Sequence, residues 1–156
     1  MTTLSFATAT IALMQPEDFP AVIEIERKSN SHPWTERNFH DAMTSGYLSL
    51  VAREHGHVCA FAIARTLVDE AELLLIAVTP SERRQGVAAL IWNELAQRLR
   101  VAGAKKIFLE VRATNAPARG FYASRGLSQI GVRKNYYPNG ILDGDREDAV
   151  LMQATL

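Results

Sequence analysis

A glutamate, a tyrosine and a pair of arginines beside a glycine are the residues of this sequence whose surroundings favour chemistry. Glu110 interrupts an apolar stretch, and Tyr122 follows it after a short loop. Arg83, Arg84 and Gly86 come soon after another apolar stretch. A carboxylate in such surroundings can accept a proton, a tyrosine can donate a hydrogen bond, and backbone N–H groups at a helix start can bind an anion.

Glu110 is expected near the carboxyl end of a parallel strand over residues 106–111, where open α/β sheets place their ligands. Alternate strand residues face opposite ways, so Glu110 shares a face with Phe108. One interpretation makes Glu110 a structural carboxylate that pairs with Arg112 or Arg119. The other makes it a general base, because apolar surroundings strengthen its tendency to take up a proton.

The segment RRQGVA at residues 83–88 lies where a strand is expected to pass into a helix. The first N–H groups of a helix point outward together and carry partial positive charge, which suits a phosphate. Arginines at a helix start oppose its dipole, so Arg83 and Arg84 favour a bound anion over a simple helix start. The segment lacks the Lys-Ser or Lys-Thr of a P-loop and the spaced glycines of a dinucleotide-binding turn.

Hydrophobic periodicity places these residues in a regular order of elements. Strands are predicted at residues 4–13, 47–53, 58–68, 73–78, 106–111, 130–134 and 149–153, and helices at 16–28, 36–44, 86–102 and 117–124. Strand, helix and strand in the second half imply a parallel pair joined by a crossover. The sequence therefore predicts an α/β (α+β) fold with a mixed sheet of about seven strands and about four helices, in one domain over residues 1–156.

Composition excludes several classes of protein. The chain has 156 residues, 47% of them apolar, which suffices for a sizeable core. Seventeen basic residues balance seventeen acidic ones, so no net basic field attracts nucleic acid or an anionic membrane. Residues 73–78, the longest apolar run, are far too few to span a membrane, and the start lacks the basic residues of a secretory signal. We expect a cytoplasmic protein without nucleic-acid or membrane partners.

Metal and cysteine chemistry are not favoured. His55 and His57 lie two apart in a polar turn and lack the further ligands that a zinc site requires, so no metal is predicted. Cys59 is the single cysteine and cannot form an internal disulfide. Its apolar strand neighbours make a small core residue a better interpretation than a nucleophile.

The turn at residues 83–88, with Val78 and Pro80 ahead of it, resembles the acetyl-CoA loop of the GCN5-related N-acetyltransferases (GNAT), Gln/Arg-x-x-Gly-x-Gly/Ala. The order of elements agrees with that family over nearly the whole chain. The resemblance implies the GNAT fold and acetyl-CoA as co-substrate, with backbone amides at residues 84–89 on the pyrophosphate. The residues that it assigns to the cofactor are Ile76, Ala77, Val78, Arg83, Arg84, Gln85, Gly86, Val87, Ala88, Ala89, Asn115 and Tyr122.

Residues 115–127 are similar to the family's pattern Asn-x-x-Ala/Gly followed by Phe/Tyr-Tyr and Gly-Phe/Leu. The resemblance implies that Asn115 binds the pantetheine arm and that Tyr122 lies beside the cofactor sulfur, whereas position alone makes Tyr122 a core residue. In the mechanism that follows, an amine attacks the thioester directly in a ternary complex. Glu110 and Tyr122 are its catalytic residues, with Glu110 as base and the N–H of Val78 as donor to the oxyanion.

Four further strings are HPWTE at 32–36, LEVRATN at 109–115, RKNYYP at 133–138 and REDA at 146–149. They resemble family members that acetylate the N-terminal alanine of a bacterial small-subunit ribosomal protein. The resemblance implies that the acceptor is the N-terminal segment of such a ribosomal protein and that Trp34, Tyr136 and Tyr137 bind it. Leu75 departs from the pattern because a polar or aromatic residue is expected there, and residues 139–145 form a longer loop than usual.

Two other functions stay open at this point. A small-amine acetyltransferase, acting on a polyamine or aminoglycoside, needs a carboxylate-rich cleft, for which Asp143, Asp145, Glu147 and Asp148 are candidates. A non-catalytic acyl-CoA-binding module needs only the cofactor loop, and the presence of both Glu110 and Tyr122 speaks against it.

Overall fold

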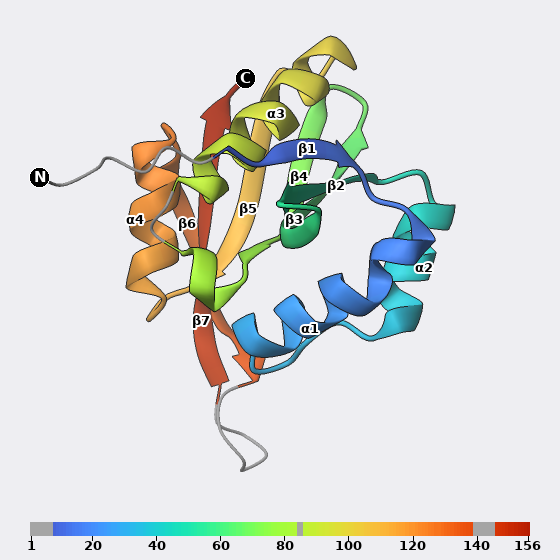
Figure 1. Ribbon diagram of the computed structural model, residues 1–156. Coiled ribbons are helices and arrows are strands. Elements are labelled where there is room, and N and C mark those ends of the chain that lie inside the picture. The colour runs from blue at the N-terminus through green and yellow to red at the C-terminus, as the bar shows by residue number, and fades with distance from the viewer. Residues whose placement is uncertain (1–7, 84–85, 139–145) are drawn as a thin grey trace, which may run out of the picture.

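The computed structural model describes residues 8–83, 86–138 and 146–156, which form one seven-stranded sheet with helices on both faces (Figure 1). The strands are β1 Thr10–Leu13, β2 Leu48–Glu54, β3 His57–Leu67, β4 Glu70–Val78, β5 Lys106–Arg112, β6 Ser128–Pro138 and β7 Arg146–Thr155. The α-helices are α1 Phe19–Ser29, α2 Glu36–Thr44, α3 Val87–Val101 and α4 Ala116–Ser124. The predicted mixed sheet of seven strands with four helices is confirmed.

The order of strands in the sheet is β1-β2-β3-β4-β5-β7-β6. Neighbouring strands are antiparallel except β4 and β5, which run parallel. Helix α3 makes the crossover between these two strands, as the sequence predicts. The last strand, β7, inserts between β5 and β6, so residues of β6 lie one strand away from β5.

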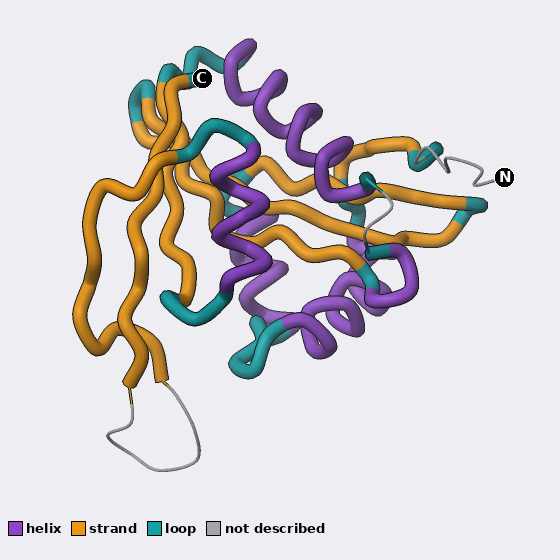
Figure 2. Tube along the Cα trace, turned by 90° about the vertical axis from the view of Figure 1, so that its left-hand side faces the viewer, coloured by secondary structure: helices purple, strands orange, loops and turns teal. Residues whose placement is uncertain are grey.

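β4 and β5 pair only at their first residues. The paired positions run from Glu70 opposite Lys106 to Glu72 opposite Phe108, and no pair follows in the described strands. On its other edge β4 has a bulge at Leu74. The consecutive β3 residues Ile63 and Ala64 lie opposite Leu75 and Leu73, so Leu74 is an extra residue without a partner in β3. Bulges bend a strand and increase its twist. The two strands therefore diverge towards their carboxyl ends, and Figure 2 shows the strands spreading into two groups.

Two apolar layers cover the sheet. On one face α3 packs Ile91 and Leu95 against β5 residues Ile107 and Leu109, and α4 adds Tyr122 to the same cluster. On the other face α1 and α2 pack Phe19, Val22 and Phe39 against Phe61 and Ile63 of β3. Complete burial of a side chain of this size stabilises the fold by about 1.5–3 kcal/mol. The layers leave the open ends of β4 and β5 between them.

Element boundaries differ from the predicted ones where turn residues lie within strands. β6 and β7 are several residues longer than predicted, because β6 accommodates Asn135 in a bulge and ends at Pro138. The helix predicted at residues 16–28 begins as a short 3-10 turn, Pro16–Asp18, and α1 itself starts at Phe19. Of the strand predicted at 4–13, residues 10–13 are confirmed and residues 1–7 lie outside the described ranges. α2 has its predicted bounds and its predicted cap, Thr35, whose hydroxyl accepts the N–H of Asn38.

Cys59 is a small core residue, as predicted. It is buried under α3, and its Sγ lies 3.5 Å from the carbonyl oxygen of Ala52. Burial and the nearby carboxylates of Glu82 and Glu54 raise the pKa of the Cys59 thiol. Because the thiolate is the nucleophilic form, this environment makes Cys59 unreactive.

An ion pair fixes the start of α1 on the sheet. Asp18 is buried, and Arg53 of β2 donates to both of its oxygens, at 2.9 Å and 3.0 Å. The N–H of Gln15 donates to the same carboxylate at 2.8 Å. Burial alone would raise the pKa of Asp18, but the hydrogen bonds from Arg53 and Gln15 outweigh it and lower the pKa. The pair thereby sets the direction in which α1 runs towards the diverging ends of β4 and β5.

Replacing Asp18 with asparagine is expected to lower the free energy of unfolding at pH 7 by about 1–3 kcal/mol, since a partly buried guanidinium loses its counter-ion. The folded pKa of Asp18 lies below the unfolded one, so the stabilisation is present above pH of about 4 and disappears as pH falls through the folded value. The difference between wild type and Asp18→Asn should therefore narrow in acid.

Urea unfolding at several pH values between 3 and 7 measures this effect. Exposed Glu17, the preceding residue, provides the matched control Glu17→Gln. A difference between wild type and Asp18→Asn that stays constant across this pH range would contradict the assignment.

Candidate active site

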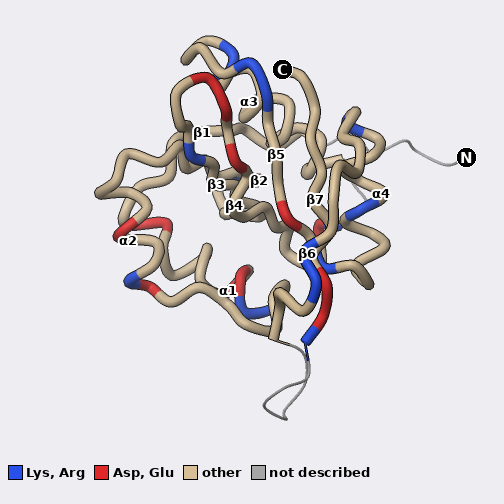
Figure 3. The backbone as a smooth tube through the Cα atoms, turned by 180° about the vertical axis from the view of Figure 1, so that it is seen from behind, with Lys and Arg blue, Asp and Glu red and all other residues tan. Residues whose placement is uncertain are grey.

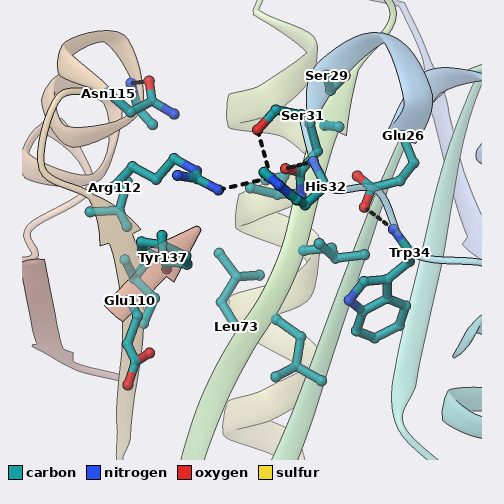
Figure 4. A pocket seen from close by; sticks show the side chains of 18 of the residues that line it. Glu26, Ser29, Ser31, His32, Trp34, Leu73, Glu110, Arg112, Asn115 and Tyr137 are labelled. Atoms are coloured by element: carbon teal, nitrogen blue, oxygen red, sulfur yellow. Dashed lines mark hydrogen bonds between the residues drawn. The ribbon is translucent and has the colours of Figure 1, made fainter. Parts of the chain in front are cut away.

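The gap between the diverging strands is a cleft of about 700 Å³, a volume typical of small-molecule sites (Figure 4). Its walls come from β4, β5, the end of β6, the start of α4, the C-terminal half of α1 and the loop that follows it. It brings together eight of the residues predicted from sequence: Trp34, Ile76, Ala77, Glu110, Asn115, Tyr122, Tyr136 and Tyr137.

The backbone of β4 presents polar groups to this cleft. The N–H of Thr79 donates to the carbonyl of Cys59 at 2.7 Å, which makes these residues a hydrogen-bonded pair of the antiparallel β3–β4 ladder. Hydrogen-bonded and non-bonded pairs alternate along such a ladder, so the next pair, Ala60 with Val78, is non-bonded. The N–H groups of Val78 and Ile76 therefore point away from β3, towards the gap that β5 leaves open.

Gly86 begins α3 after the turn that follows β4, and neither Val78 nor residues 86–89 are among the residues that line the cleft. Gly86 is the N-cap and has a φ of 82°, in the left-handed region that favours glycine. The first intrahelical hydrogen bond runs from the N–H of Leu90 to the carbonyl of Gly86, at 3.1 Å. The N–H groups of Val87, Ala88 and Ala89 thus precede the helical ladder, and glycine has no side chain to cap them. Such a helix start is suited to a phosphate.

Of the two arginines in this turn, the structure describes the contacts of Arg83 only. Arg83 donates from Nε to the carbonyl of Val78 at 3.0 Å and from Nη2 to Ser29 Oγ at 3.1 Å. Its side chain therefore connects the end of β4 to the end of α1, a use that the argument from the helix dipole did not foresee. Arg84 and the neighbouring Gln85 lie outside the described residues.

Glu110 lies in the cleft with its side chain 15% exposed. Ile107, Leu109 and Val111 of β5 are buried under α3, so Glu110 faces the α1 side of the sheet. Its Oε1 lies 3.1 Å from Nε of Arg133 on β6, and the same carboxyl group raises the pKa of nearby Tyr136. Figure 3 shows acidic and basic residues close together on β5 and β6.

The pairing of Glu110 with Arg112 or Arg119 is wrong. Arg112 forms an ion pair with Glu147 and donates to the carbonyl of Pro138, and Arg119 donates to the carbonyl of Ala113. Arg112, two residues along β5, is paired with Glu147 of β7. The guanidinium near Glu110 comes instead from Arg133 of β6. The expected apolar surroundings of Glu110 thus include an arginine and a phenol.

Tyr122 and Asn115 lie on the α4 side of the cleft. Tyr122 is 9% exposed and packs against Trp92, with ring centroids 6.2 Å apart, and against Phe121 at 5.6 Å. Burial, with a smaller contribution from nearby Tyr137, raises the pKa of Tyr122 far above its usual value, so its hydroxyl stays protonated. Asn115 caps α4 by accepting the N–H of Ala118 at 3.2 Å, which leaves its amide NH₂ group as a donor.

Aromatic residues and Arg112 form the opposite part of the cleft. The rings of Tyr136 and Tyr137 meet edge-on with centroids 4.9 Å apart, and the guanidinium of Arg112 lies 4.6 Å from the ring of Tyr137. Burial and the carboxylate of Glu110 raise the pKa of Tyr137 to about 12. Arg112 also lies 3.4 Å from Nδ1 of His32, and Figure 4 shows this contact joining the two walls.

Glu26 is a cleft residue that sequence reasoning missed. It is only 2% exposed, and its Oε2 accepts the N–H of Trp34 at 2.9 Å, which ties the loop after α1 to the helix. Burial raises the pKa of Glu26, and hydrogen bonds from Trp34 and Asn30 act against that rise. A signal was present, because Glu26 follows Val22 by four residues on the apolar face of α1.

The described ranges 8–83, 86–138 and 146–156 contain no group of three or more His, Cys, Asp or Glu residues that could hold a metal ion. None of their helices combines the length and the apolar character that crossing a membrane requires. The prediction of no metal stays a prediction.

Comparisons with known proteins agree on one family. Residues 16–127 match the family described as Acetyltransferase (GNAT) family. The ribosomal protein bS18-alanine N-acetyltransferase of Escherichia coli (strain K12) is 38% identical over 143 residues, which cover 92% of this chain and 95% of the relative. The enzyme of that name from Haemophilus ducreyi is 40% identical over 136 residues, covering 87% and 92%.

A solved structure supports the same relationship. The crystal structure of the ribosomal-protein-S18-alanine N-acetyltransferase from Escherichia coli has a TM-score of 0.86 and 36% identity to this chain. The alignment covers 95% of this chain and 94% of that one.

Replacing Glu26 with glutamine is expected to raise the free energy of unfolding at pH 7, because a neutral amide oxygen still accepts the N–H of Trp34 without burying a charge. Glu26→Ala removes the acceptor and is expected to lower it by about 1–3 kcal/mol. The folded pKa of Glu26 lies above its ordinary value of about 4.5. Its stabilisation is therefore complete below pH of about 4.5 and lost as pH rises through the folded value.

Urea unfolding between pH 4 and 7.5 should show that dependence weakened in Glu26→Gln. Glu24 is exposed on the same helix, and Glu24→Gln serves as control. A Glu26→Gln protein as unstable as Glu26→Ala would refute this interpretation.

Proposed function

The chain belongs to the acetyltransferase (GNAT) family, and from this premise we propose that it transfers the acetyl group of acetyl-CoA to the α-amine of a peptide that begins with alanine. Relatives that share most of its length are named for that acceptor on ribosomal protein bS18. The proposed partner is accordingly the N-terminal segment of a small-subunit ribosomal protein, modified in the cytoplasm. The observation that carries this proposal is that Glu110 and Ile76, whose backbone N–H points away from β3, line one cleft, with the N–H of Val78 on the same open edge of β4.

The residues present suit coenzyme A. The uncapped N–H groups at the start of α3 suit its pyrophosphate, and the open edge of β4 at Ile76 and Val78 suits the amides of its pantetheine arm. The amide of Asn115 offers a further donor in the cleft. When bound, acetyl-CoA supplies a thioester carbonyl as electrophile.

The chain's own residues then have three roles. Glu110 takes the proton of the attacking amine, directly or through one water molecule. The N–H of Val78 donates to the carbonyl oxygen as negative charge develops on it. Tyr122 donates a hydrogen bond to the departing sulfur, which keeps the electron pair of the broken C–S bond while the new C–N bond forms.

Reference pKa values favour this acceptor and this role of Tyr122. An α-amine has a pKa of about 7.7–8.0 and a lysine about 10.4, so deprotonation costs the N-terminus roughly 3 kcal/mol less. A thiol has a pKa of about 8.5 and a phenol about 10, so a thiolate is a weaker base than a phenolate, and burial raises the pKa of Tyr122 further. Proton transfer from Tyr122 to the thiolate is uphill by more than about 2 kcal/mol, so hydrogen bonding is the favoured role.

The acceptor end of the cleft supports a peptide over a polycation. Trp34, Tyr136 and Tyr137 line it, and Leu75 adds apolar surface suited to a small first side chain. Of the acidic residues considered for a polyamine, Glu147 accepts hydrogen bonds from Thr114 and Arg112, and Asp148 accepts one from Asn135. Asp143 and Asp145 lie outside the described residues.

Incubated with acetyl-CoA and a short alanine-starting peptide, the protein is expected to release free CoA, measured as thiol. The same peptide carrying a blocked α-amine and an internal lysine is the matched control and should give no release, because only the α-amine loses its proton readily near pH 7. Release that is faster with spermidine than with the peptide would contradict the acceptor class. Cofactor binding without turnover on any amine would contradict the enzyme.

Glu110→Gln and Tyr122→Phe are each expected to lower kcat by about 10²-fold or more, because each loses an interaction that matters during the chemical step. The dissociation constant of acetyl-CoA, measured by calorimetry, should stay unchanged. Glu70→Gln, an exposed glutamate of β4 outside the cleft, is the control. Wild-type kcat in both site variants would remove these residues from the mechanism.

A further inference from the structure

Tyr136 and Tyr137 are consecutive residues of β6, yet both rings line the cleft and touch each other. Successive side chains of a regular strand point to opposite faces, so a regular β6 could supply only one of them. The register shows the cause. Arg133 lies opposite Ala149 and Tyr137 lies opposite Glu147, which leaves the three residues 134–136 opposite Asp148 alone. β6 therefore carries a bulge of two extra residues at this point.

A carboxylate holds this bulge. The N–H of Asn135 donates to Oδ1 of Asp148 at 2.9 Å, in place of a carbonyl of the ladder. Asn135 has a φ of 53°, in the left-handed region, which asparagine tolerates better than most residues. The carbonyl of Asp148 accepts the N–H of Ala113 at 3.0 Å, so the same residue is also fixed to the segment after β5.

Two β6 side chains meet at Glu110: Arg133 comes from the regular pairing before the bulge, and the bulge adds Tyr136. Arg133, just before it, places Nε 3.1 Å from Glu110 Oε1, and the carboxyl group of Glu110 raises the pKa of Tyr136, at the end of the bulge. The guanidinium of Arg133 lies 5.4 Å from the ring of Tyr136, so the two side chains also support each other. Glu110 is thus held from both ends of one irregular segment.

We propose that Asp148 is a positioning residue: by holding the N–H of Asn135 it keeps β6 bulged, so that Arg133 and Tyr136 fix the carboxylate of Glu110 for proton transfer. This inference rests on the proposed function, in which Glu110 takes the proton of the acceptor amine. A strand that relaxed to regular pairing would turn Tyr136 to the other face. Misplacement of a catalytic group by about 1 Å can cost about 10²-fold in rate.

Asp148→Ala is expected to lower kcat about tenfold with the KM for acetyl-CoA unchanged, because the groups proposed to bind the cofactor belong to β4, α3 and α4 and not to β6. Asp148→Asn keeps an oxygen in the same position and should retain most of kcat. Asn135 offers a second pair of variants. Asn135→Gly permits the left-handed backbone and should retain activity, whereas Asn135→Val opposes it and should lose kcat as Asp148→Ala does.

A second readout does not depend on activity. The carboxyl group of Glu110 raises the pKa of Tyr136, so loss of the bulge should bring that pKa down towards about 10. The chain has four tyrosines, and ring-labelled ¹³C-tyrosine NMR can follow each through a pH titration. The Tyr136 titration should move in Asp148→Ala and stay in place in Asp148→Asn.

The outcomes separate the two proposals. Wild-type kcat and an unmoved Tyr136 titration in Asp148→Ala overturn the positioning role, and so does equal damage by Asp148→Asn, which would assign the effect to charge. If Asp148→Ala does not fold, the comparison of Asn135→Gly with Asn135→Val decides instead. A wild-type protein that acetylates no peptide defeats the proposed function, while the Tyr136 titration still decides whether Asp148 holds the bulge.

Discussion

The short pairing of β4 with β5 is the constraint on which the site depends. After three paired positions the strands separate, and the N–H groups of Ile76 and Val78 face a gap instead of a neighbouring strand. Unpaired backbone groups inside a sheet are costly unless water or a ligand satisfies them. An extended molecule with amide groups of its own can fill the position of the missing strand pairing. The binding site is therefore a consequence of incomplete sheet formation, which the bulge at Leu74 maintains by bending β4 away from β5.

Three carboxylates near the cleft have different uses because their surroundings differ. Glu26 is almost fully buried, and desolvation raises its pKa, so it serves to hold the loop at Trp34. Glu147 accepts hydrogen bonds from the hydroxyl and N–H of Thr114, which lower its pKa and make it a fixed anchor for Arg112. Glu110 combines partial exposure with partners on a single strand, β6, which leaves one side of the carboxyl group open to the gap. Environment, and not residue type, therefore distinguishes Glu110 as the proposed base.

The local sequence predicted the helices and strands, and it predicted residues such as Gly86 whose role depends on the backbone at a helix start. Periodicity located α3 and β4, and the turn chemistry located Gly86 at the start of a helix. The partner of Glu110 was not predictable, because Arg133 lies near it only through the insertion of β7 between β5 and β6, which no local pattern reveals. Likewise, Arg83 looked like an anion ligand on its helix-start position, while its hydrogen bonds to Val78 and Ser29 depend on where α1 ends. Long-range pairing, rather than propensity, decided each of these cases.

The arrangement of the two faces bears on the order of bond formation. The groups suited to coenzyme A belong to α3, α4 and the open edge of β4, while Trp34, Tyr136 and Tyr137 belong to the α1 side of the sheet. A gap that passes between the strands lets two substrates meet from opposite faces with Glu110 at their junction. A covalent route needs a nucleophile in the cleft, but the single cysteine, Cys59, is buried under α3 with a raised thiol pKa. Both observations support direct transfer with both substrates bound, in which β6 positions the base and β4 stabilises the oxyanion.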